Sequence, residues 1–291
     1  AGSRFFGGSG WTPTNMGTLT TTNDMPFLDA PRDVYRMGEE GTDYTIGYHT
    51  YQEPVTATTT SGIQAMINTG ANQVIVQPGV YEEDVYLVNG VELIGTNPDW
   101  TIIKPLSGSS ADALVRAMGS NGASFSRFTL DGENSSLDGF AATGNAANLT
   151  VERIRIYDTD SGITLDGPDS DVEVAHATVA NNSNGLVATN CASIDVRNSI
   201  FAYNSGVGLS HQACADVELH TYNLYWANGS DFGVDADAGA AELFLDPSFV
   251  DPMDHDYRTL NFSPVIDAGN PTDPSPPGAG SRADIGYIEQ G

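Results

Sequence analysis

The fold of this chain is decided by residues 149–224, which read LTVERIRIYDTDSGITLDGPDSDVEVAHATVANNSNGLVATNCASIDVRNSIFAYNSGVGLSHQACADVELHTYNL. Pairs of apolar residues, separated by one residue, recur there at steps of 23, 22 and 23 residues. The pairs are Leu149/Val151, Val172/Val174, Ile194/Val196 and Val217/Leu219. A second short apolar segment follows each pair, and a polar turn such as TDSG, NNSNG, YNSG or ANGS follows that segment. The stretch is therefore an internal repeat.

Each repeat contains two or three short segments in which apolar and polar residues alternate, a pattern typical of β-strands. No segment is long enough for the helical crossovers of an α/β sheet. The simplest solution is a parallel coil in which each repeat forms one rung, inward apolar residues stack, and turn asparagines form hydrogen-bonded ladders. An antiparallel β-sandwich also has short strands at regular spacing, but it does not explain the repeat length. The sequence therefore predicts an all-β fold, a parallel β-helix.

Two further segments resemble a known superfamily. Residues 74–105, VIVQPGVYEEDVYLVNGVELIGTNPDWTIIKP, resemble the opening of the right-handed parallel β-helix proteins of the pectate-lyase-like superfamily. Residues 244–271 and 283–291 resemble the tail segment of many secreted members. The resemblance covers about residues 58–291 and implies a single-stranded right-handed β-helix. It implies no single activity, because the superfamily contains lyases, hydrolases, epimerases, esterases and non-catalytic surface proteins.

The composition divides the chain into three parts. Residues 1–57 form an irregular N-terminal arm rich in aromatic residues and threonine, residues 58–245 form the β-helix, and residues 246–291 form a C-terminal capping tail of the same domain. A short helix is expected at 62–68, with Ser61 as its N-cap. Both open ends of a β-helix carry unpaired backbone groups, so we expect the helix to cover one end and the tail to cover the other.

The two cysteines occupy equivalent positions in neighbouring repeats, because Cys191 precedes Ile194 by three residues and Cys214 precedes Val217 by three residues. Rungs lie about 4.8 Å apart, which is within the Cα range of a disulfide. We expect a Cys191–Cys214 disulfide, with a reduced pair in a turn as the alternative. The chain opens on Ala1 without an initiator methionine, as a secreted protein does after its signal peptide is removed. A secreted, extracellular or cell-surface location is therefore expected.

The charge of the chain excludes several partners. It has 38 acidic and 11 basic residues, and its formal net charge is -27. Such a molecule repels phosphate backbones and anionic lipid headgroups, so nucleic-acid binding is not expected. No segment has the roughly 18 apolar residues that a membrane span needs. Lys104 is the only lysine, which leaves few candidates for a lysine base.

The repeat also aligns charged residues on the outside of the coil. Glu173, Asp195 and Glu218 fall in one outward column, and Arg197 and His220 fall in the next. Stacked carboxylates about 5 Å apart have the separation of the catalytic pair in a retaining glycosidase. These five residues are therefore the candidate catalytic set. The alternative is a solvated strand face whose charges are partly paired with arginines.

Acidic clusters could supply oxygen ligands to Ca²⁺, the one cofactor that the sequence suggests. The candidate metal ligands are Asp158, Asp160, Asp235 and Asp237. None of these clusters has EF-hand spacing or the nonapeptide calcium-repeat pattern. The alternative is that these aspartates form turns and increase solubility.

Two functions fit these observations. The first is an extracellular structural or adhesive protein, which assembles with itself into an oligomer or filament through its N-terminal arm and its helix ends. This hypothesis explains an aromatic arm on a rigid acidic body. The second is a secreted carbohydrate-active enzyme, a polysaccharide hydrolase or lyase, that uses the outward carboxylates. The acidity counts against a polyuronate lyase, because a polyanion would be repelled without a metal.

Overall fold

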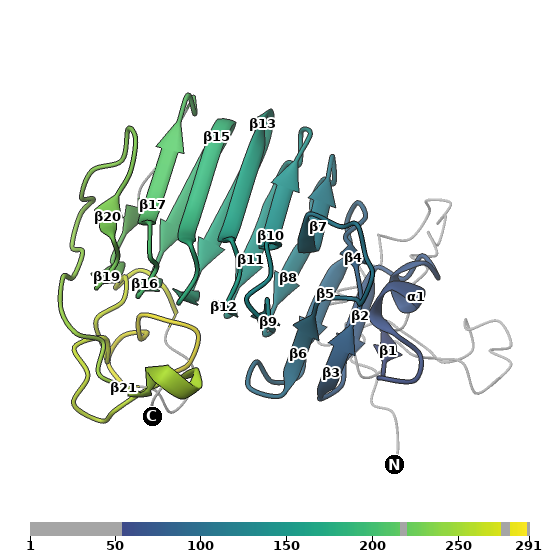
Figure 1. The fold of residues 1–291 in the computed structure, drawn as a ribbon, viewed down its shortest axis with the longest axis horizontal. Helices are drawn as coiled ribbons and strands as arrows, with labels where there is room; N and C mark the ends of the chain where they lie inside the picture. The colour runs from purple at the N-terminus through teal and green to yellow at the C-terminus, as the bar shows by residue number, and fades with distance from the viewer. Residues whose placement is uncertain (1–53, 216–219, 275–279, 290–291) are drawn as a thin grey trace, which may run out of the picture. The chain divides into compact units, whose positions relative to one another are not determined.

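The structure is a computed structural model that describes residues 54–215, 220–274 and 280–289. Within these residues the chain winds into a coil whose rungs stack side by side (Figure 1). The strands form a 13-stranded sheet and a seven-stranded sheet, and neighbouring strands in both are parallel. The predicted parallel β-helix is therefore confirmed.

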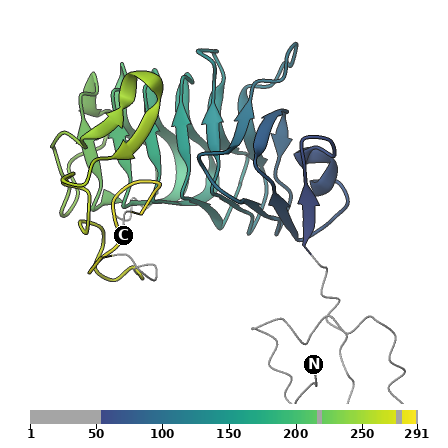
Figure 2. The same cartoon turned by 90° about the horizontal axis from the view of Figure 1, so that it is seen from below.

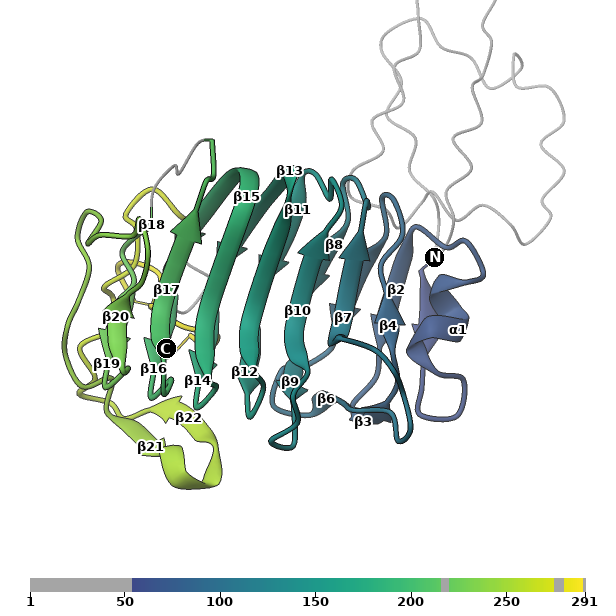
Figure 3. The ribbon, with the colours of Figure 1, turned by 45° about the horizontal axis from the view of Figure 1, so that its top comes forward.

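The larger sheet, sheet A, and the smaller one, sheet B, take one or two strands from each rung. The strands of sheet A are β1 (Val55–Ala57), β2 (Gln73–Val76), β4 (Val85–Tyr86), β5 (Glu92–Gly95), β7 (Ala113–Met118), β8 (Ser124–Ser126), β10 (Asp138–Thr143), β11 (Leu149–Glu152), β13 (Ser161–Ala175), β15 (Asn184–Arg197), β17 (Val207–Gln212), β18 (His220–Thr221) and β20 (Ser230–Phe232). The strands of sheet B are β3 (Gly79–Glu82), β6 (Thr101–Lys104), β9 (Thr129–Asp131), β12 (Arg155–Tyr157), β14 (Thr178–Ala180), β16 (Ile200–Ala202) and β19 (Leu224–Trp226). In Figure 3, β10, β13 and β15 lie side by side.

The apolar pairs of the repeat stack inside the coil. Leu149 lies opposite Val172, which lies opposite Ile194, and each is at most 3% exposed. One rung earlier, the ring of Phe125 stacks on the ring of Phe128 with centroids 4.5 Å apart. Burying such side chains supplies about 25 cal/mol for each Å² of apolar surface removed from water, so the interior column is the main source of stability.

In five successive rungs, from β8 onward, a single residue in the left-handed region turns the chain from sheet A into sheet B. These residues, which we call the corner column, have φ angles between 50° and 65°: Arg127, Arg153, His176, Asn198 and Tyr222. The tight turn repeats from rung to rung, so it places side chains of very different chemistry in one row. Left-handed backbone costs a non-glycine residue roughly 1 kcal/mol or more, and asparagine tolerates it best.

The expected asparagine ladder is present at a second turn. The side-chain amide of Asn182 donates to Oδ1 of Asn204 at 3.1 Å, and that of Asn204 donates to Oδ1 of Asn228 at 2.9 Å. Backbone groups join the ladder, because the carbonyl of Val179 accepts from the Asn204 amide at 3.1 Å. Asn182 and Asn204 are at most 4% exposed, so the ladder satisfies groups that water does not reach.

The predicted short helix is α1 (Ile63–Ile67), which lies at one end of the coil (Figure 2). The predicted N-cap is wrong, because the hydroxyl of Ser61 bonds the backbone of Thr58 instead. The carboxylate of Glu83 accepts from the backbone N–H of Ile63, at 2.9 and 3.0 Å, and from that of Gln64 at 3.0 Å. Glu83, which follows the helix in the chain, therefore caps the N-terminus of α1 in place of Ser61.

The predicted N-terminal arm lies almost entirely outside the described residues. Its last residues, Val55–Ala57, are strand β1, which pairs with β2. The β-helix therefore begins before the expected boundary at residue 58, because this strand completes the sheet beside α1.

The described part of the C-terminal tail packs against sheet B, and not over the open end that we expected it to cover. It contains an antiparallel pair, β21 (Phe249–Asp251) and β22 (Asp256–Thr259), joined by a short 3-10 turn. A second apolar cluster joins the tail to the outer face of sheet B, and its members include Tyr157, Ala180, Ala202, Leu224, Phe249, Tyr257, Val265, Ile285 and Tyr287. The later strands of sheet B present apolar side chains such as Ala180, Ala202 and Leu224 on their outer face, and the tail buries them.

Candidate functional site

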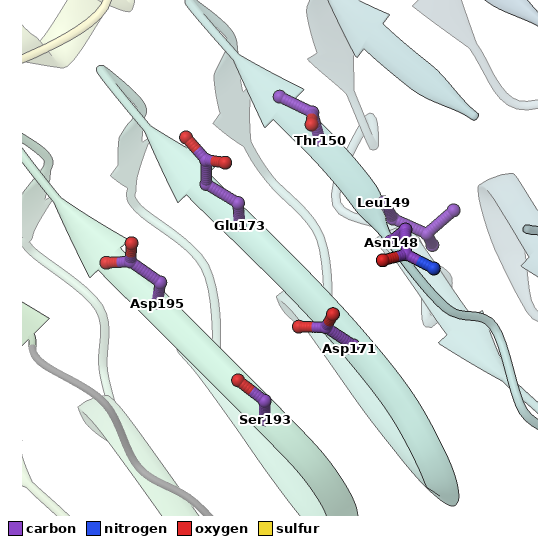
Figure 4. Close-up of a pocket in the computed structure, with 7 residues that line it drawn as sticks. All are labelled: Asn148, Leu149, Thr150, Asp171, Glu173, Ser193 and Asp195. Atoms are coloured by element: carbon purple, nitrogen blue, oxygen red, sulfur yellow. The ribbon is translucent and has the colours of Figure 1, made fainter. Parts of the chain in front are cut away.

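Two carboxylates of the predicted column lie side by side on sheet A. Glu173 on β13 is directly opposite Asp195 on β15, and Thr150 on β11 is opposite Glu173. Figure 4 shows the three side chains on one outward face, around a shallow depression of about 340 Å³ that Asp171 and Ser193 also line. The side chains of Glu173 and Asp195 are 40% and 41% exposed. The register prediction for this pair is correct.

Arg197 binds both carboxylates, and its single positive charge offsets only part of their negative charge. Its guanidinium donates to Glu173, to Oδ2 of Asp195 at 3.0 Å and to Oδ2 of Asp273 at 3.1 Å. Burial raises the pKa of Asp195 above its ordinary value, and Arg197 partly offsets this effect. The third carboxylate, Asp273, belongs to the tail, so this arginine also holds the tail against the coil.

Of the other two members of the predicted set, only His220 lies within the described residues, and it does not join this cluster. Glu218 lies outside the described residues. His220 was expected beside Arg197, and this placement is wrong, because His220 lies opposite Val196 and Thr221 lies opposite Arg197. The last repeat is one residue longer than the pattern suggested, and a shift of one residue moves a side chain to the other face of a strand.

His220 instead forms a buried pair with Glu242. Its Nδ1 lies 2.9 Å from Oε1 of Glu242, whose side chain is 1% exposed. The hydroxyl of Tyr225 reaches the same oxygen at 3.4 Å. Burial raises the pKa of Tyr225 well above its ordinary value, and the carboxylate of Glu242 adds to this effect. The pair lies within the last rungs and faces away from the carboxylate depression.

The tail contacts of the corner column were not predicted. The backbone N–H of Asn270 donates to Oδ1 of Asn198 at 2.7 Å, and the side chain of Asn198 donates to Asp273 at 2.6 Å. Nδ1 of His176 lies 3.1 Å from the carbonyl oxygen of Asp284. Burial lowers the pKa of His176 to about 4, and the charge of Arg153 acts in the same direction. The partners are separated by 72 to 108 residues, so no local pattern could indicate them.

A comparison with protein-family models agrees with the fold. Residues 101–237 match the family model described as the right-handed beta helix region. The chain carries a right-handed β-helix. Among solved structures, the A-module of the Azotobacter vinelandii mannuronan C-5 epimerase AlgE4 is similar over 63% of this chain and 70% of that chain, with 17% identity and a TM-score of 0.33. No curated protein matches the sequence.

The predicted disulfide of this β-helix is present. Cys191 and Cys214 are bonded, with their Cα atoms 4.3 Å apart. Cys191 is buried against the interior, whereas Cys214 is partly exposed. The bond ties two successive rungs near the C-terminal end. In the part of the β-helix that the structure describes, no helix is long and apolar enough to cross a membrane.

The proposed calcium ligands do not form a ready site. The carboxylate of Asp158 accepts from the side-chain amide of Asn181 at 2.6 Å, and it lies 3.3 Å from Nε2 of His255. Asp160, Asp235 and Asp237 are exposed on turns. Over residues 54–215, 220–274 and 280–289, no three His, Cys, Asp or Glu side chains are grouped so that they could hold a metal ion. Calcium binding stays a prediction.

Proposed function

We propose that this protein is an extracellular structural or adhesive β-helix. The observation that carries the proposal is that Arg197, the cation at the centre of the carboxylate cluster, forms ion pairs within the protein. It is bound by Glu173, Asp195 and Asp273, so the cluster fastens the tail along the coil. A charged group that is held in this way stabilises a scaffold and is not free to bind a substrate.

Two features support the extracellular setting and the scaffold role. A structural disulfide persists in oxidising surroundings, and here it joins successive rungs. The asparagine ladder, the buried interior and the attached tail all favour one rigid shape. The net charge of -27 keeps such a surface soluble in the absence of its partner.

The C-terminal end of the coil is the part that we expect to associate. Val234 and Leu245 follow the last strands and are 55% and 51% exposed. Exposed apolar groups at the end of a stacked coil favour contact with another chain. We propose that this end of the coil binds a second copy of the chain, so that coils join end to end.

Sedimentation velocity of the full chain over a range of concentrations, with and without Ca²⁺, tests this assembly. We expect oligomers whose mass rises with concentration, and a shift to monomer in the double variant Val234→Ser/Leu245→Ser. The matched control is Val80→Ser/Val88→Ser, because these valines are 49% and 43% exposed on earlier rungs. A wild-type chain that stays monomeric at every concentration would rule the proposal out.

One observation favours a second candidate function, a secreted polysaccharide hydrolase or lyase. Glu173 and Asp195 lie opposite each other in an open depression, and a carboxyl group with a raised pKa suits a general acid. Incubation with a panel of neutral and acidic polysaccharides tests it, with new reducing ends or unsaturated uronate as the signal. Glu173→Gln and Asp195→Asn should abolish this activity while Asp237→Asn preserves it. Failure of the wild-type protein on the whole panel would reject the enzyme.

A further inference from the structure

A second groove lies where the end of the tail meets the early rungs, away from the carboxylate depression. It is lined by Thr96, Asn97, Pro98, Asp99, Arg127, Arg153, Tyr287, Ile288 and Glu289. Its volume of about 380 Å³ is in the lower part of the range of small-molecule sites in proteins. The lining combines amide, hydroxyl and guanidinium groups with the apolar surfaces of a proline and an isoleucine.

Arg127 is the unusual residue of this groove. Every other lysine and arginine of the described residues has a carboxylate or carbonyl partner: Lys104, Arg116, Arg153, Arg155, Arg197, Arg258 and Arg282. Arg127 is exposed and makes no side-chain hydrogen bond or ion pair within that part of the chain. In a protein with a net charge of -27, an unpaired guanidinium in a groove is available for an anion.

The carboxylates of the groove do not compensate Arg127, because each already has its own partners. Asp99 accepts from the hydroxyl of Tyr287 at 2.9 Å and from Arg155 at 3.2 Å. Glu289 accepts from the backbone N–H of Asp284 at 3.0 Å and lies 3.5 Å from Arg153.

The corner column sets the position of the two arginines that line the groove. Arg127 and Arg153 are the left-handed residues of successive rungs, with φ of 65° and 53°. Successive rungs lie about 4.8 Å apart, so both guanidinium groups extend from the same edge of the coil. Arg153 is occupied by Glu152 and Glu289, which leaves Arg127 as the group that meets a ligand.

We propose that this groove binds a sugar that carries one carboxylate. A guanidinium binds a carboxylate through two parallel hydrogen bonds. Asn97 accepts from the N–H of Asp99 through its Oδ1, so its amide nitrogen can donate to a sugar hydroxyl, and Pro98 and Ile288 offer an apolar wall to a ring face. A single charge fits better than a polyanion, since the whole molecule repels many charges at once. The site requires neither the structural nor the enzymatic role proposed above.

Isothermal titration of the full chain with methyl β-glucuronide at low ionic strength tests the site, with methyl β-glucoside and sodium sulfate as comparison ligands. We expect binding of the glucuronide, a loss of about tenfold or more in affinity in Arg127→Asn, and no change in Arg116→Gln. Asparagine tolerates the left-handed backbone at position 127, so the variant should fold, which near-UV circular dichroism and Tm verify. Arg116→Gln removes the same charge from β7 of sheet A.

Three results would overturn the proposal. The first is an absence of glucuronide binding by the wild-type protein at the highest concentration tested. The second is equal affinity of wild-type and a folded Arg127→Asn variant. The third is equal affinity for the glucuronide and the uncharged glucoside, or for the glucuronide and sulfate alone, since either shows that the groove does not recognise a carboxylate on a sugar.

Discussion

At the scale of single residues, the turns of the coil depend on side chains that replace backbone partners. Asn204 is the middle member of the asparagine ladder, and it is fully buried. It donates to Val179 and Asn228 and accepts from Asn182. The sequence indicated such a ladder from its turn asparagines, because the spacing of the repeat places them in successive rungs.

Replacing Asn204 by alanine should therefore lower the free energy of unfolding by about 2–4 kcal/mol, because several buried polar groups lose their partners together. Urea unfolding measures this change. Asn72→Ala is the matched control, since Asn72 is exposed, and it should change stability by less than about 0.5 kcal/mol. Equal losses in the two variants would contradict a structural role for the ladder.

His176 gives a second prediction at this scale. It is 5% exposed, and burial lowers its pKa to about 4, whereas the unfolded chain has a value near 6.5. Between about pH 6.5 and 4 the unfolded state therefore binds more protons, and the histidine destabilises the fold progressively as pH falls. The full loss is about 3 kcal/mol.

Urea unfolding from pH 7 to pH 4 measures this loss against His176→Asn, which keeps a residue suited to φ of 51°. The stability difference between wild-type and variant should move in favour of the variant as the pH falls. The comparison is needed because Asp138, Asp195 and Glu289, whose pKa values burial raises, respond to acid in the opposite direction. A constant difference across the range would disprove a buried neutral histidine.

At the scale of elements, the sequence pattern predicted the register of the interior strands. It did not predict the register of the last rung or the position of the tail. The strand pairs β11, β13 and β15 have the predicted register, since alternating apolar residues leave one way to bury them. The last rung is shifted by one residue from the predicted register, and this shift places His220 beside Glu242. The position of the tail also differs, because the tail buries an apolar cluster on the outer face of the later strands of sheet B.

The disulfide is an element-scale device whose contribution can be measured. Cys191 and Cys214 close a loop of 23 residues, so the double variant Cys191→Ala/Cys214→Ala should lose about 3 kcal/mol of stability. Thermal unfolding with and without a reducing agent measures this loss. The reducing agent should lower the Tm of wild-type and leave that of the variant unchanged. A Tm of the oxidised wild-type equal to that of the variant would show that the bond adds nothing.

At the scale of the whole molecule, the net charge of -27 is a source of self-repulsion that the fold tolerates. The Debye length falls from about 10 Å at 0.1 M salt to about 3 Å at 1 M salt. Concentrated KCl should therefore stabilise the protein, with a rise in Tm of about 5 °C or more between 0.1 and 2 M.

The control for this prediction is the triple variant Asp166→Asn, Asp169→Asn and Asp237→Asn. These aspartates are exposed, and no ion pair involves them in the described part of the chain. The variant should show a smaller rise with KCl than the wild-type protein. A Tm that falls with KCl, or an identical rise in both proteins, would mean that charge repulsion is not what salt relieves.

The sequence by itself determined the coil, the disulfide and the pairing of Glu173 with Asp195, because a repeat with apolar alternation can bury its side chains in only one register. Tertiary structure alone decided which charges are free. Arg197 is bound by Asp273 of the tail, whereas Arg127 has no such partner among the described residues. The reason is physical: the interior is set by neighbours one repeat away, whereas the tail is attached by contacts between residues far apart in the chain.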